Sequence, residues 1–279
     1  MEKMQKINYG LVISDFDGTL VNEDGTICEI NKQAISKYVA AGGKFAISTG
    51  RLPNGILPRA QELDLKGAVS CCQGAVIVDI ETKAVLFQRF IPNAVAIKIC
   101  KKIEEMNLHL HVYDVWNFYC NKDDEFLKWY EEVTRTKTNL VLDRPISDML
   151  KETGMDVCKF IIMLPKEQAG EVMQKLKAEN FEGCVITKSA DYLVEVVNKN
   201  CSKGTSVEFL AKYYKIPLEK TIGVGDQWND LAMVKTAGLG IAVNNADELL
   251  KTNADVVCEY TNEEGAIGRI IEKYGYTEE

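Results

Sequence analysis

Aspartates follow two apolar segments that lie far apart in the sequence. Asp15 and Asp17 come directly after residues 9–14 (YGLVIS), and Asp226 follows residues 221–225 (TIGVG). In open α/β sheets, ligands bind outside the carboxyl ends of the strands, so we expect these carboxylates to meet at one edge. Two like charges about 4 Å apart repel by about 4 kcal/mol at an effective dielectric of about 20. Such a cluster needs a cation.

Magnesium is the cation that fits these residue types. Asp230, four residues beyond Asp226, adds a further carboxylate to Asp15 and Asp17. Mg²⁺ is a hard ion that prefers oxygen and joins one or two carboxylates to a substrate phosphate. Transition metals fit less well, because no His or Cys ligand spacing accompanies these aspartates. We therefore expect a Mg²⁺ site.

A carboxylate beside magnesium can attack phosphorus and form an aspartyl-phosphate. This reaction also needs an acid that protonates the leaving oxygen and later activates water. Asp17 lies two residues beyond Asp15 and can serve as that acid and base. Gly18 permits a tight turn that keeps both side chains near the crevice. The sequence thus offers a nucleophile and a general acid in one short segment.

Phosphoryl transfer also requires groups that hold the equatorial oxygens of the phosphate. Thr49 follows the predicted strand 44–48 (KFAIS), and its hydroxyl can donate a hydrogen bond. Gly50 allows a backbone amide to approach closely. Lys203 begins a predicted helix and supplies a positive charge. We expect these three residues to bind phosphate.

The first and last thirds of the chain alternate apolar strands with helices. Continuous apolar strands separated by helices predict a parallel sheet covered on both faces. We predict a doubly wound, Rossmann-like α/β domain made of residues 1–83 and 197–279. The predicted strands are residues 9–14, 44–48, 67–72, 75–78, 221–225, 239–243 and 254–258, and the predicted helices are 30–39 and 203–214.

The middle third, residues 84–196, has a different pattern that predicts an inserted α+β module. The predicted helices lie at 95–106, 126–133 and 169–176, and the predicted strands at 108–113, 117–121, 157–164, 182–187 and 191–197. Such a module can close over a bound substrate and determine specificity, while the α/β domain carries out the chemistry.

Composition excludes several classes of protein. The net charge is −8 and 46% of the residues are hydrophobic. Generic nucleic-acid binding is not expected, since it needs a basic patch. No apolar window is long enough for a membrane helix, and the first residues do not resemble a signal peptide. We expect a cytoplasmic protein whose partner is a small molecule; the oligomeric state is not readable.

Nine cysteines do not indicate a disulfide framework, because their number is odd, no CxxC occurs, and most lie within apolar segments. Buried free cysteines fit a reducing cytosol. The two histidines, His109 and His111, alternate in LHLHVY and should point to one face of a strand. A metal pair and a substrate-contacting surface stay open, with ordinary packing favoured.

Four segments together carry a family resemblance. Residues 15–19 (DFDGT) resemble the first motif of the haloacid dehalogenase superfamily of phosphatases, and 49–51 (TGR) resemble its second. Residues 202–204 (SKG) resemble the third motif and 225–230 (GDQWND) the fourth. The order and spacing also match, and the position of the middle module resembles the Cof-type subfamily IIB with a C2B cap.

The resemblance implies roles for the first-motif residues and for the metal ligands. Asp15 would be the nucleophile and a magnesium ligand. Asp17 would be the general acid and base, and its backbone carbonyl would bind magnesium. Asp226 would be the second side-chain ligand, and Asp230 would support the metal site.

The resemblance also implies a phosphate-binding set. Thr49, with Gly50, and Lys203 would hold the phosphate, and Asn229 would add a hydrogen bond. For Arg51, a substrate contact and a structural ion pair stay equally open. Gln73 stands where relatives often have Asn, which leaves any substrate contact at that position unassigned.

Together these features predict an Mg²⁺-dependent phosphatase that hydrolyses sugar phosphates or related small phosphomonoesters through an aspartyl-phosphate. Two alternatives remain. A sugar-phosphate mutase on the same fold would return the phosphoryl group to a sugar, and a non-catalytic protein would only bind the phosphorylated ligand.

Overall fold

The computed structural model describes residues 6–277, which divide into two compact units. The first comprises the described residues up to Gly50, Leu57–Leu86 and the described residues from Ser202 onward, and the second comprises Arg51–Ile56 and Phe87–Cys201. The short segment from Arg51 to Ile56, which the sequence placed in the α/β domain, belongs to the second unit. No helix among residues 6–277 is both long and apolar enough to cross a membrane.

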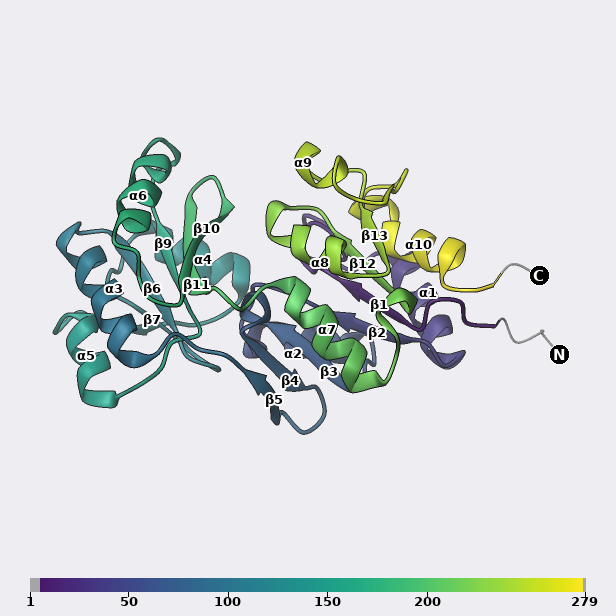
Figure 1. Cartoon of the computed structure of the whole chain (residues 1–279), viewed down its shortest axis with the longest axis horizontal. Helices are drawn as coiled ribbons and strands as arrows, with labels where there is room; N and C mark the ends of the chain where they lie inside the picture. Colours follow the sequence, from purple (N-terminus) through teal and green to yellow (C-terminus); the bar gives the residue numbers. More distant parts are fainter. Residues whose placement is uncertain (1–5, 278–279) are drawn as a thin grey trace. The chain divides into compact units, whose positions relative to one another are not determined.

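A five-stranded parallel sheet forms the centre of the first unit, in the order β14-β13-β12-β1-β2 (Figure 1). Its strands are β1 (Leu11–Ser14), β2 (Lys44–Ile47), β12 (Thr221–Gly225), β13 (Leu239–Ala242) and β14 (Val256–Val257). Strands β1 and β12 are buried along their whole length. Burial on both faces explains their continuous apolar sequences and confirms the predicted α/β fold class.

Helices cover this sheet as two packed pairs. Helix α1 packs against α10, and α7 packs against α8 (Figure 1). The helices of this unit are α1 (Glu29–Ala40), α7 (Lys203–Tyr214), α8 (Leu231–Thr236), α9 (Glu248–Lys251) and α10 (Ala266–Tyr274), with 3₁₀ turns η1 (Cys72–Gly74), η2 (Leu218–Lys220), η3 (Trp228–Asp230) and η4 (Asn262–Glu264). Helix α2 (Pro53–Glu62) begins in the second unit and ends in the first.

Of the strands predicted at 67–72 and 75–78, the first lies parallel to the β2 segment through an isolated bridge between Ser48 and Ser70, but the second does not continue the parallel arrangement. They form β3 (Ala68–Cys71) and β4 (Val76–Asp79), which pair antiparallel, and β4 pairs with β5 (Val85–Gln88). Cys72 and Gln73 adopt left-handed backbone conformations, with φ of 51° and 59°. Together with Gly74, whose φ is 86°, they turn the chain back on itself, so residues 76–79 run antiparallel to β3 and the expectation of a parallel strand there was wrong.

The second unit contains a six-stranded sheet in the order β10-β11-β9-β6-β7-β8, antiparallel except between β7 and β8. Its strands are β6 (His109–Tyr113), β7 (Phe118–Cys120), β8 (Asn139–Leu140), β9 (Lys159–Met163), β10 (Cys184–Ala190) and β11 (Leu193–Asn198). Its helices are α3 (Asn93–Glu105), α4 (Glu125–Thr134), α5 (Ile146–Thr153) and α6 (Lys166–Ala178). Helix α5 was not predicted from the sequence.

Side chains of β6, β9 and β11 alternate between two different environments. Leu110, Val112, Phe160 and Ile162 join the apolar core formed with α3, α5 and α6. The intervening residues face the side on which α4 packs, where the rings of His111 and Tyr130 lie 4.8 Å apart. The period-two alternation therefore separates an aliphatic face from a polar and aromatic face.

Ile162→Ala should lower the free energy of unfolding of the second unit by about 2–5 kcal/mol, because Ile162 is fully buried and truncation leaves a cavity. Val185→Ala is the matched control, because Val185 is 42% exposed and its truncation should cost less than about 0.5 kcal/mol. Denaturant unfolding of the full chain measures both, and equal losses would refute this assignment of the core.

Candidate active site

A buried lysine joins two buried aspartates at the carboxyl edge of the parallel sheet. The ammonium Nζ of Lys203 lies 2.6 Å from Asp15 Oδ1 and 2.5 Å from Asp230 Oδ1. The three residues are at most 5% exposed. Asp15 follows β1, and Lys203 is the first residue of α7, which begins with a capping box at Ser202. One positive charge thus lies between two carboxylates.

Asp230 also organises the loop that follows β12. Its Oδ2 accepts hydrogen bonds from the backbone N–H groups of Asp226 at 2.9 Å and Gln227 at 3.0 Å. A Cβ on Gly225 would collide with the Asp230 side chain, so glycine is required there. Both oxygens of Asp230 are thereby committed, one to Lys203 and the other to the backbone that carries Asp226.

The first and fourth sequence motifs meet at Asp226. The hydroxyl of Thr19 donates a hydrogen bond of 2.7 Å to Asp226 Oδ1. Gly18 has φ of +78°, and a Cβ there would lie 2.5 Å from Asp226 Oδ2. Thr19 lies within the first motif, but its sequence position predicted no role for it; the fold shows that it positions Asp226.

Burial and mutual repulsion shift the pKa values of these groups. Burial, with the charge of Asp230, raises the pKa of Asp15 well above its usual range, although Lys203 opposes the shift. Burial and Asp230 likewise raise the pKa of Asp226 to about 6. Burial alone would lower the pKa of Lys203, but its contacts with Asp15 and Asp230 raise it overall. The cluster holds more negative charge than one lysine balances.

The donor atoms of this cluster suit a hard divalent cation. Ligand oxygens of Asp15, Asp226 and Asp230 lie within 4.8 Å of one another. All three are carboxylate oxygens, which Mg²⁺ prefers over softer ligands. Asp17 lies in the same turn, but its side chain is exposed. The residues present therefore fit magnesium at the position that the sequence predicted.

A second chain of contacts links the Thr49 segment to the fourth motif. Thr49 is buried. Its N–H donates a hydrogen bond to the carbonyl of Ser70, and its carbonyl accepts one from the N–H of Gln73 at 3.1 Å. The side-chain amide of Asn229 donates to Gln73 Oε1 at 3.3 Å. Asn229 Oδ1 is buried and has no hydrogen-bond partner within the described part of the chain. Gln73 therefore holds Asn229, a contact that the sequence did not predict.

Arg51 belongs to the second unit together with α4. Its guanidinium donates a hydrogen bond of 3.5 Å to the carbonyl of Thr134, the last residue of α4. Gly50, which precedes Arg51, belongs to the first unit and ends its N-terminal segment. The contact with Thr134 anchors Arg51 within its own unit, and a substrate contact stays a prediction.

Most of the chain matches the sequence model of a known protein family. Residues 12–271 match the family model of the haloacid dehalogenase-like hydrolases. The chain belongs to this hydrolase family. The match includes every motif that carried the sequence resemblance, so the resemblance is confirmed.

Relatives of this haloacid dehalogenase-like hydrolase include phosphatases. A Haemophilus influenzae protein with a provisional phosphatase name is 30% identical over 274 residues, covering 95% of this chain and 98% of its own. The Bacillus subtilis 5-amino-6-(5-phospho-D-ribitylamino)uracil phosphatase YitU is 25% identical over 95% of this chain and 97% of its own. The subclass IIB sugar phosphatase BT4131 shares the fold, with a TM-score of 0.81 at 23% identity over 95% and 98% of the two chains.

Magnesium should stabilise this hydrolase more above pH 6 than below it. In the metal-free fold, Asp226 has a pKa of about 6 against an ordinary 3.8, so the folded state binds the proton more tightly than the unfolded state. The stability that this proton contributes is lost as the pH rises through about 6, where the ionised carboxylate becomes free to bind the metal.

Thermal unfolding with and without Mg²⁺, over a series of pH values, measures this effect. The magnesium-induced rise in melting temperature should shrink as the pH falls through about 6. Asp226→Asn should remove most of the rise at every pH. A rise that does not change with pH in the wild type would contradict the assignment of Asp226 as a ligand.

Proposed function

We propose that this protein is an Mg²⁺-dependent phosphatase that hydrolyses small phosphomonoesters through an aspartyl-phosphate at Asp15. The observation that carries the proposal is the position of Lys203 Nζ, 2.6 Å from Asp15 Oδ1 and buried with it at the carboxyl edge of the sheet. A carboxylate nucleophile beside a fixed cation suits attack on a negatively charged phosphate, because the cation offsets the repulsion between them.

The first step transfers the phosphoryl group to the protein. A carboxylate oxygen of Asp15 attacks phosphorus while the bond between phosphorus and the leaving oxygen breaks. Asp17 donates its proton to that oxygen, so the alcohol departs neutral. The exposed side chain of Asp17 suits a group that must reach the leaving oxygen of a bound ester.

The second step returns the phosphoryl group to water. Asp17, now ionised, takes a proton from water, and the water oxygen attacks phosphorus. The bond between phosphorus and Asp15 breaks, which releases inorganic phosphate and regenerates both aspartates in their starting protonation states. One residue thus acts as acid and then as base.

Other residues hold the phosphoryl oxygens during both steps. Lys203 supplies the positive charge, and we assign hydrogen bonds to the hydroxyl of Thr49, the N–H of Gly50 and the amide of Asn229. The side chains of Asp15 and Asp226, with the backbone carbonyl of Asp17, would hold magnesium, and Asp230 would support them. When bound, the metal would neutralise charge on the transferring phosphoryl group.

Sugar phosphates and related metabolites are the proposed substrates. YitU is named for a phosphorylated ribityl compound, and BT4131 is a sugar phosphatase. A sugar-phosphate mutase is the alternative on the same residues, because water and a sugar hydroxyl can both accept the phosphoryl group. A hexose 1-phosphate separates the two: a mutase gives an isomer without free phosphate, and a phosphatase releases phosphate.

Asp15→Asn should lower phosphate release from an aryl phosphate by more than about a hundredfold, because the variant lacks the nucleophile. The same variant should be more stable than the metal-free wild type, because a neutral side chain removes repulsion from a buried site. Asp143→Asn, at an exposed position of the second unit, is the matched control and should leave both properties unchanged. Phosphate release with and without Mg²⁺, together with denaturant unfolding, tests the proposal.

Retention of activity in Asp15→Asn would remove Asp15 as nucleophile.

Lys203→Met should change the stability of the protein in the opposite direction to Asp15→Asn. It leaves two buried carboxylates without their cation and should cost about 3–5 kcal/mol, as well as most of the activity. Equal stability of Lys203→Met and wild type, measured without metal, would show that the ion pairs contribute little.

A further inference from the structure

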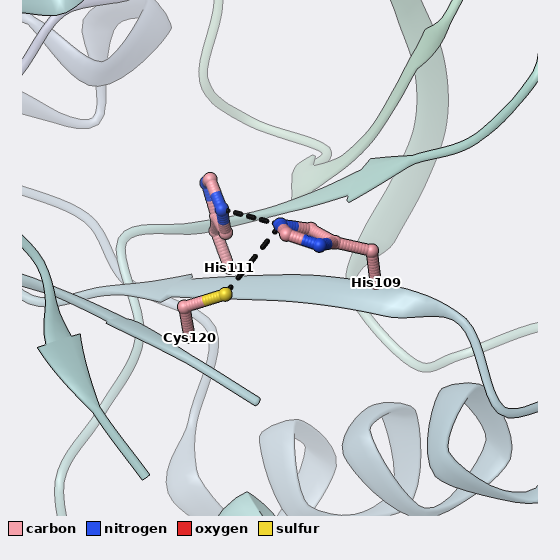
Figure 2. Close-up of side chains that lie close together, drawn as sticks. All are labelled: His109, His111 and Cys120. Atoms are coloured by element: carbon pink, nitrogen blue, oxygen red, sulfur yellow. Dashed lines mark hydrogen bonds between the residues drawn. The ribbon is translucent and has the colours of Figure 1, made fainter. Parts of the chain in front are cut away.

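The second unit contains a cluster of histidine and cysteine side chains that the proposed phosphatase chemistry does not use. His109 and His111 lie on the same face of β6, as their alternation predicted, and Cys120 on β7 stands directly opposite His111 in the antiparallel register (Figure 2). The two Nε2 atoms are 2.8 Å apart, and Cys120 Sγ is 3.4 Å from His109 Nε2. Each residue is at most 3% exposed.

We propose that His109, His111 and Cys120 form a Zn²⁺ site in the second unit, separate in its ligands from the aspartate site of the first. Two imidazole nitrogens and one sulfur are the donors of this site, and their ligand atoms lie within 4.8 Å of one another. Imidazole and thiolate ligands select zinc or copper, whereas the oxygen-only cluster of Asp15, Asp226 and Asp230 selects magnesium.

The spacing of the donors is close to that of a tetrahedral zinc site. With Zn–N of about 2.0–2.1 Å and Zn–S of about 2.3 Å, tetrahedral angles place two nitrogens about 3.4 Å apart and nitrogen and sulfur about 3.6 Å apart. The separations in the protein are 2.8 Å and 3.4 Å. Zinc binding would therefore widen the separation of the two nitrogens by about 0.6 Å and that of nitrogen and sulfur by about 0.2 Å.

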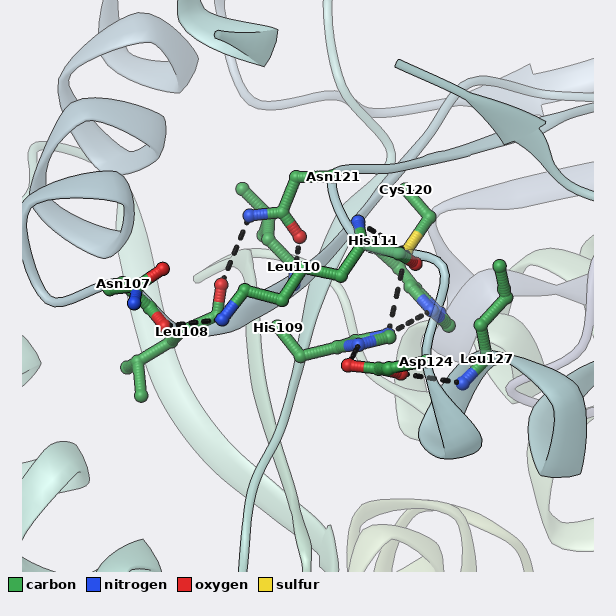
Figure 3. Close-up of polar contacts among 10 residues, drawn as sticks. Asn107, Leu108, His109, Leu110, His111, Cys120, Asn121, Asp124 and Leu127 are labelled. Atoms are coloured by element: carbon green, nitrogen blue, oxygen red, sulfur yellow. Dashed lines mark hydrogen bonds and ion pairs between the residues drawn. The ribbon is translucent and has the colours of Figure 1, made fainter. Parts of the chain in front are cut away.

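The outer ring nitrogen of His109 is already held as in many metal sites. Asp124 Oδ2 lies 2.9 Å from His109 Nδ1, which fixes the proton on Nδ1 and turns the lone pair of Nε2 toward the cluster (Figure 3). Asp124 is itself fixed as the N-cap of α4, where Oδ1 accepts from the N–H of Leu127 at 3.1 Å. His111 Nδ1 faces the hydroxyl of Tyr113 at 3.4 Å.

The segment between β7 and α4 is tied to β6 on the other side of the cluster. The side chain of Asn121 accepts from the N–H of Leu110 at 2.8 Å and donates to the carbonyl of Leu108 at 3.0 Å (Figure 3). These bonds fix the register of β6 against the segment that carries Cys120 and Asp124. These contacts to the backbone of β6 add to the side-chain contact between Asp124 and His109, so the donors are preorganised by both.

Protons and charge balance in the proposed binding step. Burial lowers the pKa of His109 and lowers that of His111 further, helped by the nearby His109 and Lys159, which favours the neutral imidazoles that bind metal. Burial raises the pKa of Cys120 to about 12, so the thiol enters protonated. Zn²⁺ would form bonds to two nitrogens and to sulfur, and the thiol proton would leave to solvent. Thiolate and Asp124 then offset the two charges of the ion.

Burial of all three ligands points to a structural role. Such an ion would join β6 and β7 directly and the start of α4 through Asp124, which are held together otherwise by hydrogen bonds and ring packing. A metal that binds the folded state alone stabilises it by mass action, so zinc should raise the melting temperature of the protein. This role is independent of whether the first unit hydrolyses phosphate esters.

Co²⁺ titration of the reduced, chelator-treated full chain tests the site, because Co²⁺ bound to a thiolate shows a sulfur-to-metal charge-transfer band that oxygen ligands cannot give. The wild type should show this band, and Zn²⁺ should displace it. Cys120→Ser should lose the band and His111→Gln should weaken binding. Cys184→Ser, at a half-buried cysteine of the same unit, and Asp226→Asn, in the oxygen site, should both keep it.

Two further measurements separate a metal site from a hydrogen-bonded cluster. Asp124→Asn should keep the band with a metal affinity about 10–100-fold weaker, because Asp124 only orients His109. Zinc should raise the melting temperature of the wild type and leave that of Cys120→Ser unchanged, with both proteins equally folded without metal. Absence of the band in the wild type, or its survival in Cys120→Ser, would overturn the proposal.

Discussion

The placement of one buried lysine between two buried aspartates sets the conditions for the rest of the catalytic unit. Lys203 offsets charge that burial makes costly in Asp15 and Asp230. Removing Lys203 would leave two buried carboxylates without their cation, at a cost of about 3–5 kcal/mol, whereas removing the charge of Asp15 leaves Lys203 paired with Asp230. A site of this kind persists only where the surrounding fold holds it firmly.

The parallel sheet provides that support. Asp15 and Asp226 directly follow the neighbouring strands β1 and β12. The register of these two strands aligns Ser14 with Val224. Asp230 fixes the backbone after β12, and Thr19 fixes the side chain of Asp226. The pKa values of Asp15 and Asp226 are raised, because burial and the remaining excess of negative charge both disfavour their ionised forms. A divalent cation would relieve this excess, which links the stability of the unit to its chemistry.

The sequence indicated which aspartates share an edge of the sheet better than it indicated the contacts that hold them there. Apolar strands that end in Asp15 and Asp226 could be recognised because parallel neighbours share an edge. The hairpin of β3 and β4 was not recognised, because two of the three left-handed residues in its turn, Cys72 and Gln73, are not glycines, and Gly74 alone did not mark a reversal. The motif sequence alone did not show that Gln73 contacts Asn229, because that contact joins segments 156 residues apart.

The histidine and cysteine cluster shows the same limit. Alternation placed His109 and His111 on one face, but only the pairing of β6 with β7 places Cys120 beside them. Helix α5 was missed because it is only 8 residues long, and its apolar face is apparent once α3 packs on it. Local periodicity predicts which face a residue occupies, whereas partners across a sheet depend on register.

The most direct test of the central claim is the stereochemical course of hydrolysis at phosphorus. A phosphorothioate monoester made chiral with oxygen isotopes would be hydrolysed in isotopically labelled water, and the configuration of the released thiophosphate determined. Transfer to Asp15 and then to water involves two inversions, so net retention is expected. Net inversion would show that water attacks the ester directly, and it would contradict the role of Asp15 as nucleophile.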